Sequence, residues 1–174
     1  PMLTVSDCTQ KTLFTAEGLA IARGRGGTPE AMVSEVRSAL ERWAQTQTSR
    51  AKAVPGGRGL LDNAVMWNPR GAGTTSLDVL STGLTGTIDD PVNDAEDYGA
   101  VVHAAPCGLV EHLSPEERYC LGAQVGALTH GHPNGWASAG ALASVIRMVS
   151  QDVPLRDAAF WAASHVRRYH PAAH

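Results

Sequence analysis

The chain has 174 residues, 43% of them hydrophobic and 18% charged, which is typical of one globular domain and not of a disordered tail. Its formal net charge of -3 argues against nucleic acid or anionic lipid as a partner, because such binding needs a basic face. No apolar run reaches the ~20 residues of a membrane-spanning helix and no signal peptide opens the chain. We therefore expect a cytoplasmic protein that makes no membrane contact.

The first part of the chain predicts two long helices. Ser6 is suited to cap a helix of roughly 16 residues, and the glycine-rich run at 24–27 ends it. Thr28 followed by Pro29 is typical of a cap and a first helical position. Apolar residues then recur at helical spacing as far as Trp43, which makes this segment the most regular of the sequence.

The middle of the chain has little periodicity. Glycine and proline interrupt every candidate element in residues 47–75, whereas residues 76–81 predict a short helix. Residues 83–99 form a polar loop rich in Asp and Thr. A long irregular stretch is uncommon in a compact domain unless it carries function or packs in a special way.

Three more helices are predicted in the last third. Residues 114–117 (SPEE) form a capping box with proline at the first helical position, and the helix should run to about Leu128. Pro133 and Pro154 begin two further helices, the first with a face of small residues that allows a close helix–helix approach. Because no long period-two alternation is present, the sequence predicts an all-α fold, with residues 1–174 as a single domain.

Two segments carry polar or small residues where a ligand could bind. Ser6 and Asp7, in residues 5–10 (VSDCTQ), can simply cap a helix, or their oxygens can bind a hard cation such as Mg²⁺ or Ca²⁺. Residues 98–109 are rich in small side chains, which let backbone amides approach a ligand. A tightly packed helix start would have the same composition, so both alternatives stay open.

A third segment, residues 129–136 (THGHPNGW), carries two histidines between two predicted helices. Together with His103 they could suggest zinc, but no recognised zinc spacing is present. Histidines beside a helix N-terminus can instead hold a phosphate, aided by the exposed amides there. A cysteine nucleophile, Cys107 or Cys120, with one of these histidines as base is a further alternative that no local signature supports.

Taken in order, these segments resemble the ADP-ribosylglycohydrolase family. Residues 6–11 (SDCTQK) are similar to the family's Thr/Ser-Asp-Asp-Thr-Gln-Met metal motif, which opens a helix. Residues 102–109 (VHAAPCGL) are similar to its Met-Arg-x-x-Pro-x-Gly-Leu segment. Residues 129–136 are similar to its Thr-His-x-His-Pro-x-Gly-Tyr/Trp segment, the most specific of the three. The likeness spans essentially the whole chain.

The resemblance implies a compact orthogonal helical bundle that uses Mg²⁺ to hydrolyse the glycosidic bond of an ADP-ribosylated protein or small molecule. It implies that Ser6 and Asp7 are metal ligands and that Asp7 is the catalytic carboxylate. It also implies an ADP-ribose-type ligand held by backbone, histidine and aromatic groups. The residues that match these substrate contacts are Gly99, Ala100, His103, His130 and Trp136.

Several departures from the family pattern bear on the metal. Cys8 stands where the second carboxylate is expected, and a soft thiol suits a hard cation poorly. Lys11 stands in place of methionine, and its ammonium would repel a metal. His103 replaces an arginine, so a permanent cation becomes a titratable group. Because the family's opening Gly-Asp-Ala-Leu-Gly-type and closing Asp-x-Asp-Thr segments are also missing, we expect weak or absent magnesium binding.

Three functions follow as hypotheses. The first is hydrolysis of an ADP-ribosyl bond, and the second is a pseudoenzyme that binds a nucleotide-ribose ligand. The third is a repurposed, metal-free enzyme with Cys8, Lys11, His103 and His130 in the old cleft. The internal substitutions favour the second and third, because truncation does not explain them. The abrupt start suggests a fragment, and missing terminal helices predict exposed apolar surface that a homo-oligomer would cover.

Overall fold

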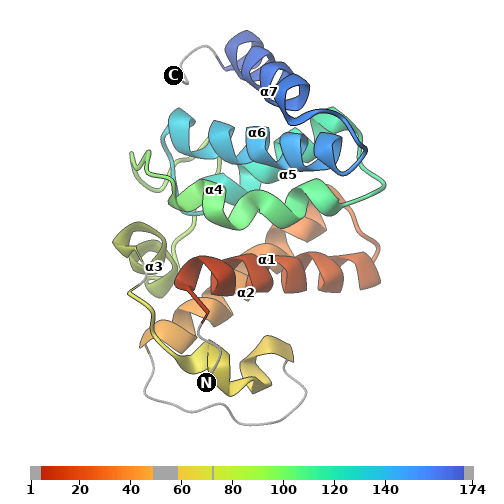
Figure 1. The fold of residues 1–174 in the computed structure, drawn as a ribbon. Helices are drawn as coiled ribbons and strands as arrows, with labels where there is room; N and C mark the ends of the chain where they lie inside the picture. The colour runs from red at the N-terminus through yellow and green to blue at the C-terminus, as the bar shows by residue number, and fades with distance from the viewer. Residues whose placement is uncertain (1–4, 49–58, 72, 171–174) are drawn as a thin grey trace.

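The computed structural model describes residues 5–48, 59–71 and 73–170. Over these ranges the chain forms seven α-helices, three short 3₁₀ helices and no β-strand, which confirms the all-α prediction (Figure 1). The elements in chain order are α1 (Asp7–Gly24), α2 (Pro29–Thr48), η1 (Gly59–Asp62), η2 (Ala64–Trp67), α3 (Thr74–Ser81), α4 (Gly99–Ala104), η3 (Ala105–Leu109), α5 (Pro115–Ala127), α6 (Pro133–Val149) and α7 (Leu155–Tyr169).

Helices α1 and α2 begin where the sequence predicts and pack closely against each other. The Ser6 hydroxyl accepts a hydrogen bond from the Thr9 amide at 3.1 Å, which caps α1. A Cβ on Gly18 would lie 2.7 Å from the Cα of Val36, so glycine is needed where the two helices touch. The largest fully buried side chains of this pair are Phe14, Met32, Leu40 and Trp43.

Helices α5 and α6 pack through small residues, as predicted. A Cβ on Gly122 would meet the Cβ of Ala143 at 2.8 Å, and one on Gly126 would meet the Cβ of Ala139 at the same distance. The predicted capping box starts α5, with both of its hydrogen bonds between Ser114 and Glu117 present. The close approach places the loop between α5 and α6 next to the start of α4.

Helix α7 lies along α6 at the outer edge of the molecule (Figure 1). Its inner side buries Ala158 and Ala162 completely or nearly so. Leu155 and Phe160 of the same helix are 65% and 76% exposed. This helix therefore exposes two large apolar side chains, and self-association stays a prediction.

Two parts of the fold differ from the sequence-based expectation. The irregular stretch 47–75 contains the last two residues of α2, η1, η2 and the first two residues of α3, while its residues 49–58 and 72 lie outside the described ranges. Residues 99–109, for which a ligand-binding segment and a tightly packed helix start were both left open, form α4 and η3. Elements of four to six residues are too short to show a helical period, so these were invisible to pattern analysis. Across the described residues, no helix has the length and apolarity to cross a bilayer.

Candidate functional site

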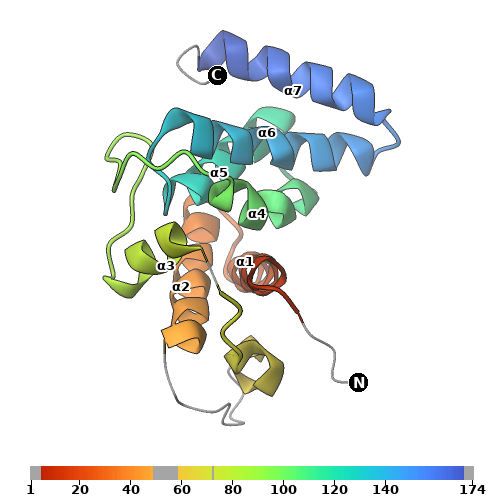
Figure 2. The same cartoon turned by 60° about the vertical axis from the view of Figure 1, so that its left-hand side comes forward.

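A polar cleft lies where α1, α3 and α4 begin. Figure 2 shows α1 almost along its axis, with α3 and α4 beside it. The cleft has a volume of about 290 Å³. Its lining comes from three segments that are far apart in the sequence: Asp7, Cys8 and Lys11 of α1, Gly71 and Gly73–Ser76 before and within α3, and Asp97–Gly99 at the start of α4.

The first wall of the cleft carries a carboxylate and a buried ammonium. The Nζ atom of Lys11 lies 3.7 Å from Oδ2 of Asp7, one helical turn away. The Lys11 side chain is only 4% exposed, and its Nζ lies 5.4 Å from the centroid of the Trp43 ring. Cys8, which is partly buried, lines the cleft beside them. Asp7 therefore already has a cationic neighbour within the protein.

The opposite wall carries a second carboxylate, Asp97, which is held by three donors. Its Oδ1 accepts a hydrogen bond from the Gly99 amide at 2.8 Å and lies 3.0 Å from Nε2 of His130. Its Oδ2 accepts from the hydroxyl of Thr75 at 2.8 Å. The Asp97 side chain is nonetheless 49% exposed. The network fixes the carboxylate while leaving part of it open to the cleft.

A buried histidine supports this carboxylate. His130 is fully buried, and its Nδ1 lies 2.8 Å from the hydroxyl of Thr129, which is also fully buried. Burial lowers the pKa of His130, although Asp97 opposes that effect, so the ring is neutral at neutral pH. The Nε2 atom then carries the proton and donates to Asp97, and the Thr129 hydroxyl donates to Nδ1.

The same network keeps Asp97 ionised. Burial alone raises the pKa of this carboxyl, but the hydrogen bonds from Thr75, Gly99 and His130 outweigh it, and the pKa falls below its usual value. Gly99 is required for this geometry because a Cβ there would lie 2.8 Å from both Asp97 Oδ1 and His130 Nε2. The glycine thus allows the carboxylate and the imidazole to meet.

The expected metal ligands occupy the start of α1. Asp7 lines the cleft, whereas Ser6 is exposed, caps the helix and is not among the lining residues. The simple capping interpretation therefore accounts for Ser6. The expected roles of both residues toward a metal stay predictions.

Of the five expected substrate contacts, Gly99 lines the cleft and four are buried elsewhere. Ala100 is fully buried against α6, and Trp136 is 5% exposed with its ring 4.8 Å from that of His170. His103 is fully buried, with Nε2 3.4 Å from the Val125 carbonyl oxygen. His130 reaches the cleft only through Asp97.

Burial also decides the protonation of His103 and the cysteine alternatives. Burial, together with the Lys11 ammonium, lowers the pKa of His103 to about 3, so this ring is not a cation at neutral pH. Burial raises the pKa of the Cys107 thiol to about 12 and, with nearby glutamates, raises that of Cys120. Neither thiol is therefore activated as a nucleophile.

Sequence reasoning missed Asp97 and the residues before α3. Asp97 stands two residues before Gly99, an arrangement in which an Asp side chain accepts from the backbone amide two positions on. That local signal was available. The contact with His130 was not, because 33 positions separate the two residues and only the tertiary fold joins them.

The residues of the cleft fit a magnesium ion poorly. Mg²⁺ takes oxygen ligands in a nearly octahedral arrangement, and one or two carboxylates, substrate phosphates and waters usually supply them. Here Asp7 faces Lys11, Cys8 offers a thiol, and three donors engage Asp97. In the part of the chain that the structure describes, no three His, Cys, Asp or Glu side chains form a group able to hold a metal ion.

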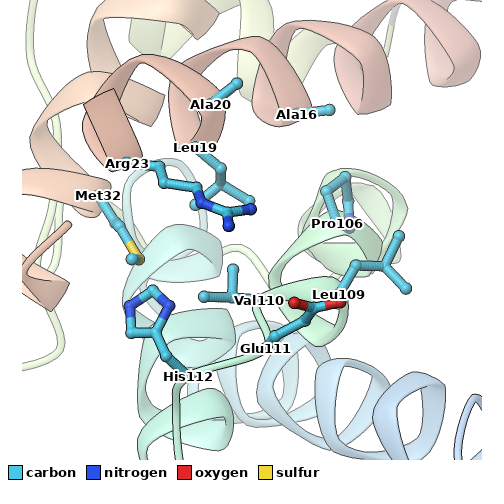
Figure 3. Close-up of a pocket in the computed structure, with 10 residues that line it drawn as sticks. All are labelled: Ala16, Leu19, Ala20, Arg23, Met32, Pro106, Leu109, Val110, Glu111 and His112. Carbon is cyan, nitrogen blue, oxygen red and sulfur yellow. The ribbon is translucent and has the colours of Figure 1, made fainter. Parts of the chain in front are cut away.

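A second pocket, of about 230 Å³, lies farther along α1 between α1, α2 and the segment after α4 (Figure 3). Its lining is mostly apolar, with Met32 and Val110 among the residues that form it. Arg23, Glu111 and His112 supply its polar groups. It contains none of the predicted site residues. Arg23, a cation on α1 that lies outside the cleft, is therefore a suitable control position for Lys11.

Comparison with known proteins places the chain in a family. No curated protein and no solved structure matches the chain. The sequence model of the ADP-ribosylglycohydrolase family matches residues 2–173, which is almost the whole length. Of the three segments that resemble the family, the one at residues 6–11 lines the cleft through Asp7, Cys8 and Lys11, and the expected substrate contact Gly99 lines it as well. The chain belongs to the ADP-ribosylglycohydrolase family.

Proposed function

We propose that the cleft binds an ADP-ribose-type ligand and that the chain acts mainly as a binding module. One observation carries the proposal: Asp7, in the segment similar to the family's metal motif, and Gly99, which matches one of the family's substrate contacts, line the same cleft. The family implies ligands of the ADP-ribose type. Polar groups on both walls supply donors and acceptors for phosphates and ribose hydroxyls.

Helix starts add to the suitability of the cleft for an anion. Thr74 begins α3 at the cleft, and its N-cap Gly73 contributes no side-chain hydrogen bond. The first amides of α3 therefore lack a side-chain cap, and such amides bind phosphate oxygens well. The first residues of α1 line the same space. Both helix dipoles favour negative charge there.

Metal-dependent hydrolysis is the less favoured function. The family typically depends on a metal that orients the ribose and activates water. In this chain the Asp7 carboxylate faces an ammonium, and the neighbouring position is a thiol. We therefore expect magnesium to bind weakly.

Asp97 supports hydrolysis as a second candidate. It is an ionised, oriented carboxylate that is half exposed to the cleft, and such a group can act as a general base toward water. A repurposed, metal-free enzyme that uses Cys8, Lys11, His103 and His130 has less support. Only Cys8 and Lys11 line the cleft, whereas both histidines are fully buried.

Calorimetry together with a release assay distinguishes these functions. As a binding module, the protein gives a saturable heat with ADP-ribose in EDTA and releases no ADP-ribose from an ADP-ribosylated peptide. Magnesium-dependent release that Asp7→Ala abolishes would establish hydrolysis instead. Release in EDTA that Asp97→Asn abolishes would favour Asp97 as the base. The absence of any heat with or without magnesium contradicts the proposal.

A further inference from the structure

Lys11 is the only cationic residue that lines the cleft among the residues described. It stands where the family motif has a methionine, and its side chain is 4% exposed. Its Nζ lies over the fully buried Trp43 ring, 5.4 Å from the ring centroid. Lys11 nevertheless contributes to the cleft lining.

Among the described residues, no group accepts a hydrogen bond from this ammonium. An ammonium group has three N–H donors, and a buried cation is costly unless acceptors surround it. Its nearest charged neighbour, Asp7 Oδ2, lies at 3.7 Å, which is an ion pair but too long for a hydrogen bond. No other acceptor contacts Nζ among the described residues. The donors are therefore available to a ligand in the cleft.

The surrounding groups make Lys11 the dominant positive charge of the site. After burial, its Coulombic field is the next cause that lowers the pKa of His103, and it also lowers the pKa of His130. Both imidazole rings are neutral at neutral pH, so neither adds positive charge to the site. The starts of α1 and α3 add partial positive charge to the same space.

We propose that Lys11 is a built-in cation that takes the place of a metal in the cleft. It neutralises Asp7 from within the protein and donates to a phosphate oxygen of the bound ligand. A divalent cation at Asp7 is disfavoured by repulsion from the same ammonium. This inference rests on the proposed ligand class, and it adds that ligand binding in this chain needs no metal.

Calorimetry with ADP-ribose in EDTA tests the first half of the inference. Lys11→Met, which keeps an unbranched side chain as far as Cε and removes the ammonium, should weaken binding about 10-fold to 100-fold, as expected for a charge-assisted hydrogen bond. The matched control Arg23→Met removes a cation from the same helix in the other pocket and should leave affinity within two-fold. Lys11→Gln, with circular dichroism to check folding, serves if the methionine variant does not fold. Unchanged affinity of a folded Lys11 variant overturns the inference.

Magnesium titration tests the second half without relying on ADP-ribose. The double variant Cys8→Asp with Lys11→Met restores two carboxylates and removes the ammonium. Its melting temperature should rise with millimolar Mg²⁺, whereas that of the unchanged protein should not. A magnesium-dependent rise in the unchanged protein overturns the inference. If the unchanged protein fails to bind ADP-ribose but the magnesium result holds, the proposed function fails and the exclusion of metal by Lys11 stands.

Discussion

The fully buried His103 predicts a steep loss of stability in mild acid. Its pKa is about 3 in the folded chain against 6.5 for the free side chain, because burial and then Lys11 disfavour the charged ring. Between these pH values the unfolded chain binds a proton that the folded chain does not. The free energy of unfolding therefore falls as the pH drops below 6.5 and continues to fall until about pH 3.

The size of the effect follows from the shift. A pH of 5 lies about 1.5 units below the pKa of the ring in the unfolded chain, so that ring is protonated, while the ring in the folded chain is still neutral. At 1.36 kcal/mol per unit, the free energy of unfolding is lower by about 2 kcal/mol than at neutral pH. The full loss approaches about 5 kcal/mol near pH 3. Groups such as His130 and Asp97 act in the same direction, so a comparison with a variant is needed.

Urea unfolding at pH 7.5 and pH 5.0 provides the assay. His103→Gln keeps a neutral amide that can donate to the Val125 carbonyl but cannot be protonated. The unchanged protein should lose about 2 kcal/mol more than the variant over this interval. Equal losses would refute the assignment of a buried, neutral His103, whatever the absolute stability of the variant.

Three further predictions concern the site, a helix cap and the surface. Gly99→Ala should destabilise the fold by about 1.5–3 kcal/mol in urea unfolding, because its Cβ would separate Asp97 from its donors. The control Gly24→Ala, where space is open, should change stability by less than about 0.5 kcal/mol. Similar effects of the two substitutions would contradict the steric argument. Ser114→Ala removes the α5 cap and should cost about 1 kcal/mol in the same assay, and no measurable cost would count against the cap as a stabilising contact. Light scattering should show an oligomer that Phe160→Ser weakens, since this ring is 76% exposed, and a monomer at all concentrations would contradict self-association.

Helices that begin with a capping residue or a proline could be predicted from the sequence alone. Ser6 and Ser114 mark the starts of α1 and α5, and both make the capping hydrogen bonds. Pro29 begins α2 as expected. These elements are encoded by neighbouring residues, so a single sequence suffices. The six-residue α4 has no such signal, because it is stabilised by burial against α6.

The site could be predicted only in part, because some of its residues are brought together by tertiary contacts and not by local sequence. The start of α1 and Gly99 could be identified from motif resemblance, and both line the cleft. His130 was expected to contact a substrate phosphate, whereas the structure buries it behind Asp97. Lys11 was expected to repel a metal, but its pairing with Asp7 and its position over Trp43 depend on packing. Burial and tertiary contacts set these roles.

A crystal structure of the protein with ADP-ribose and Mn²⁺ tests the central claim most directly. Mn²⁺ replaces Mg²⁺ at oxygen sites and gives an anomalous signal. The account predicts ADP-ribose in the cleft between α1, α3 and α4, a phosphate oxygen within hydrogen-bonding distance of Lys11 Nζ, and no anomalous peak at Asp7. A manganese ion bound to Asp7, or ADP-ribose bound outside this cleft, would contradict it.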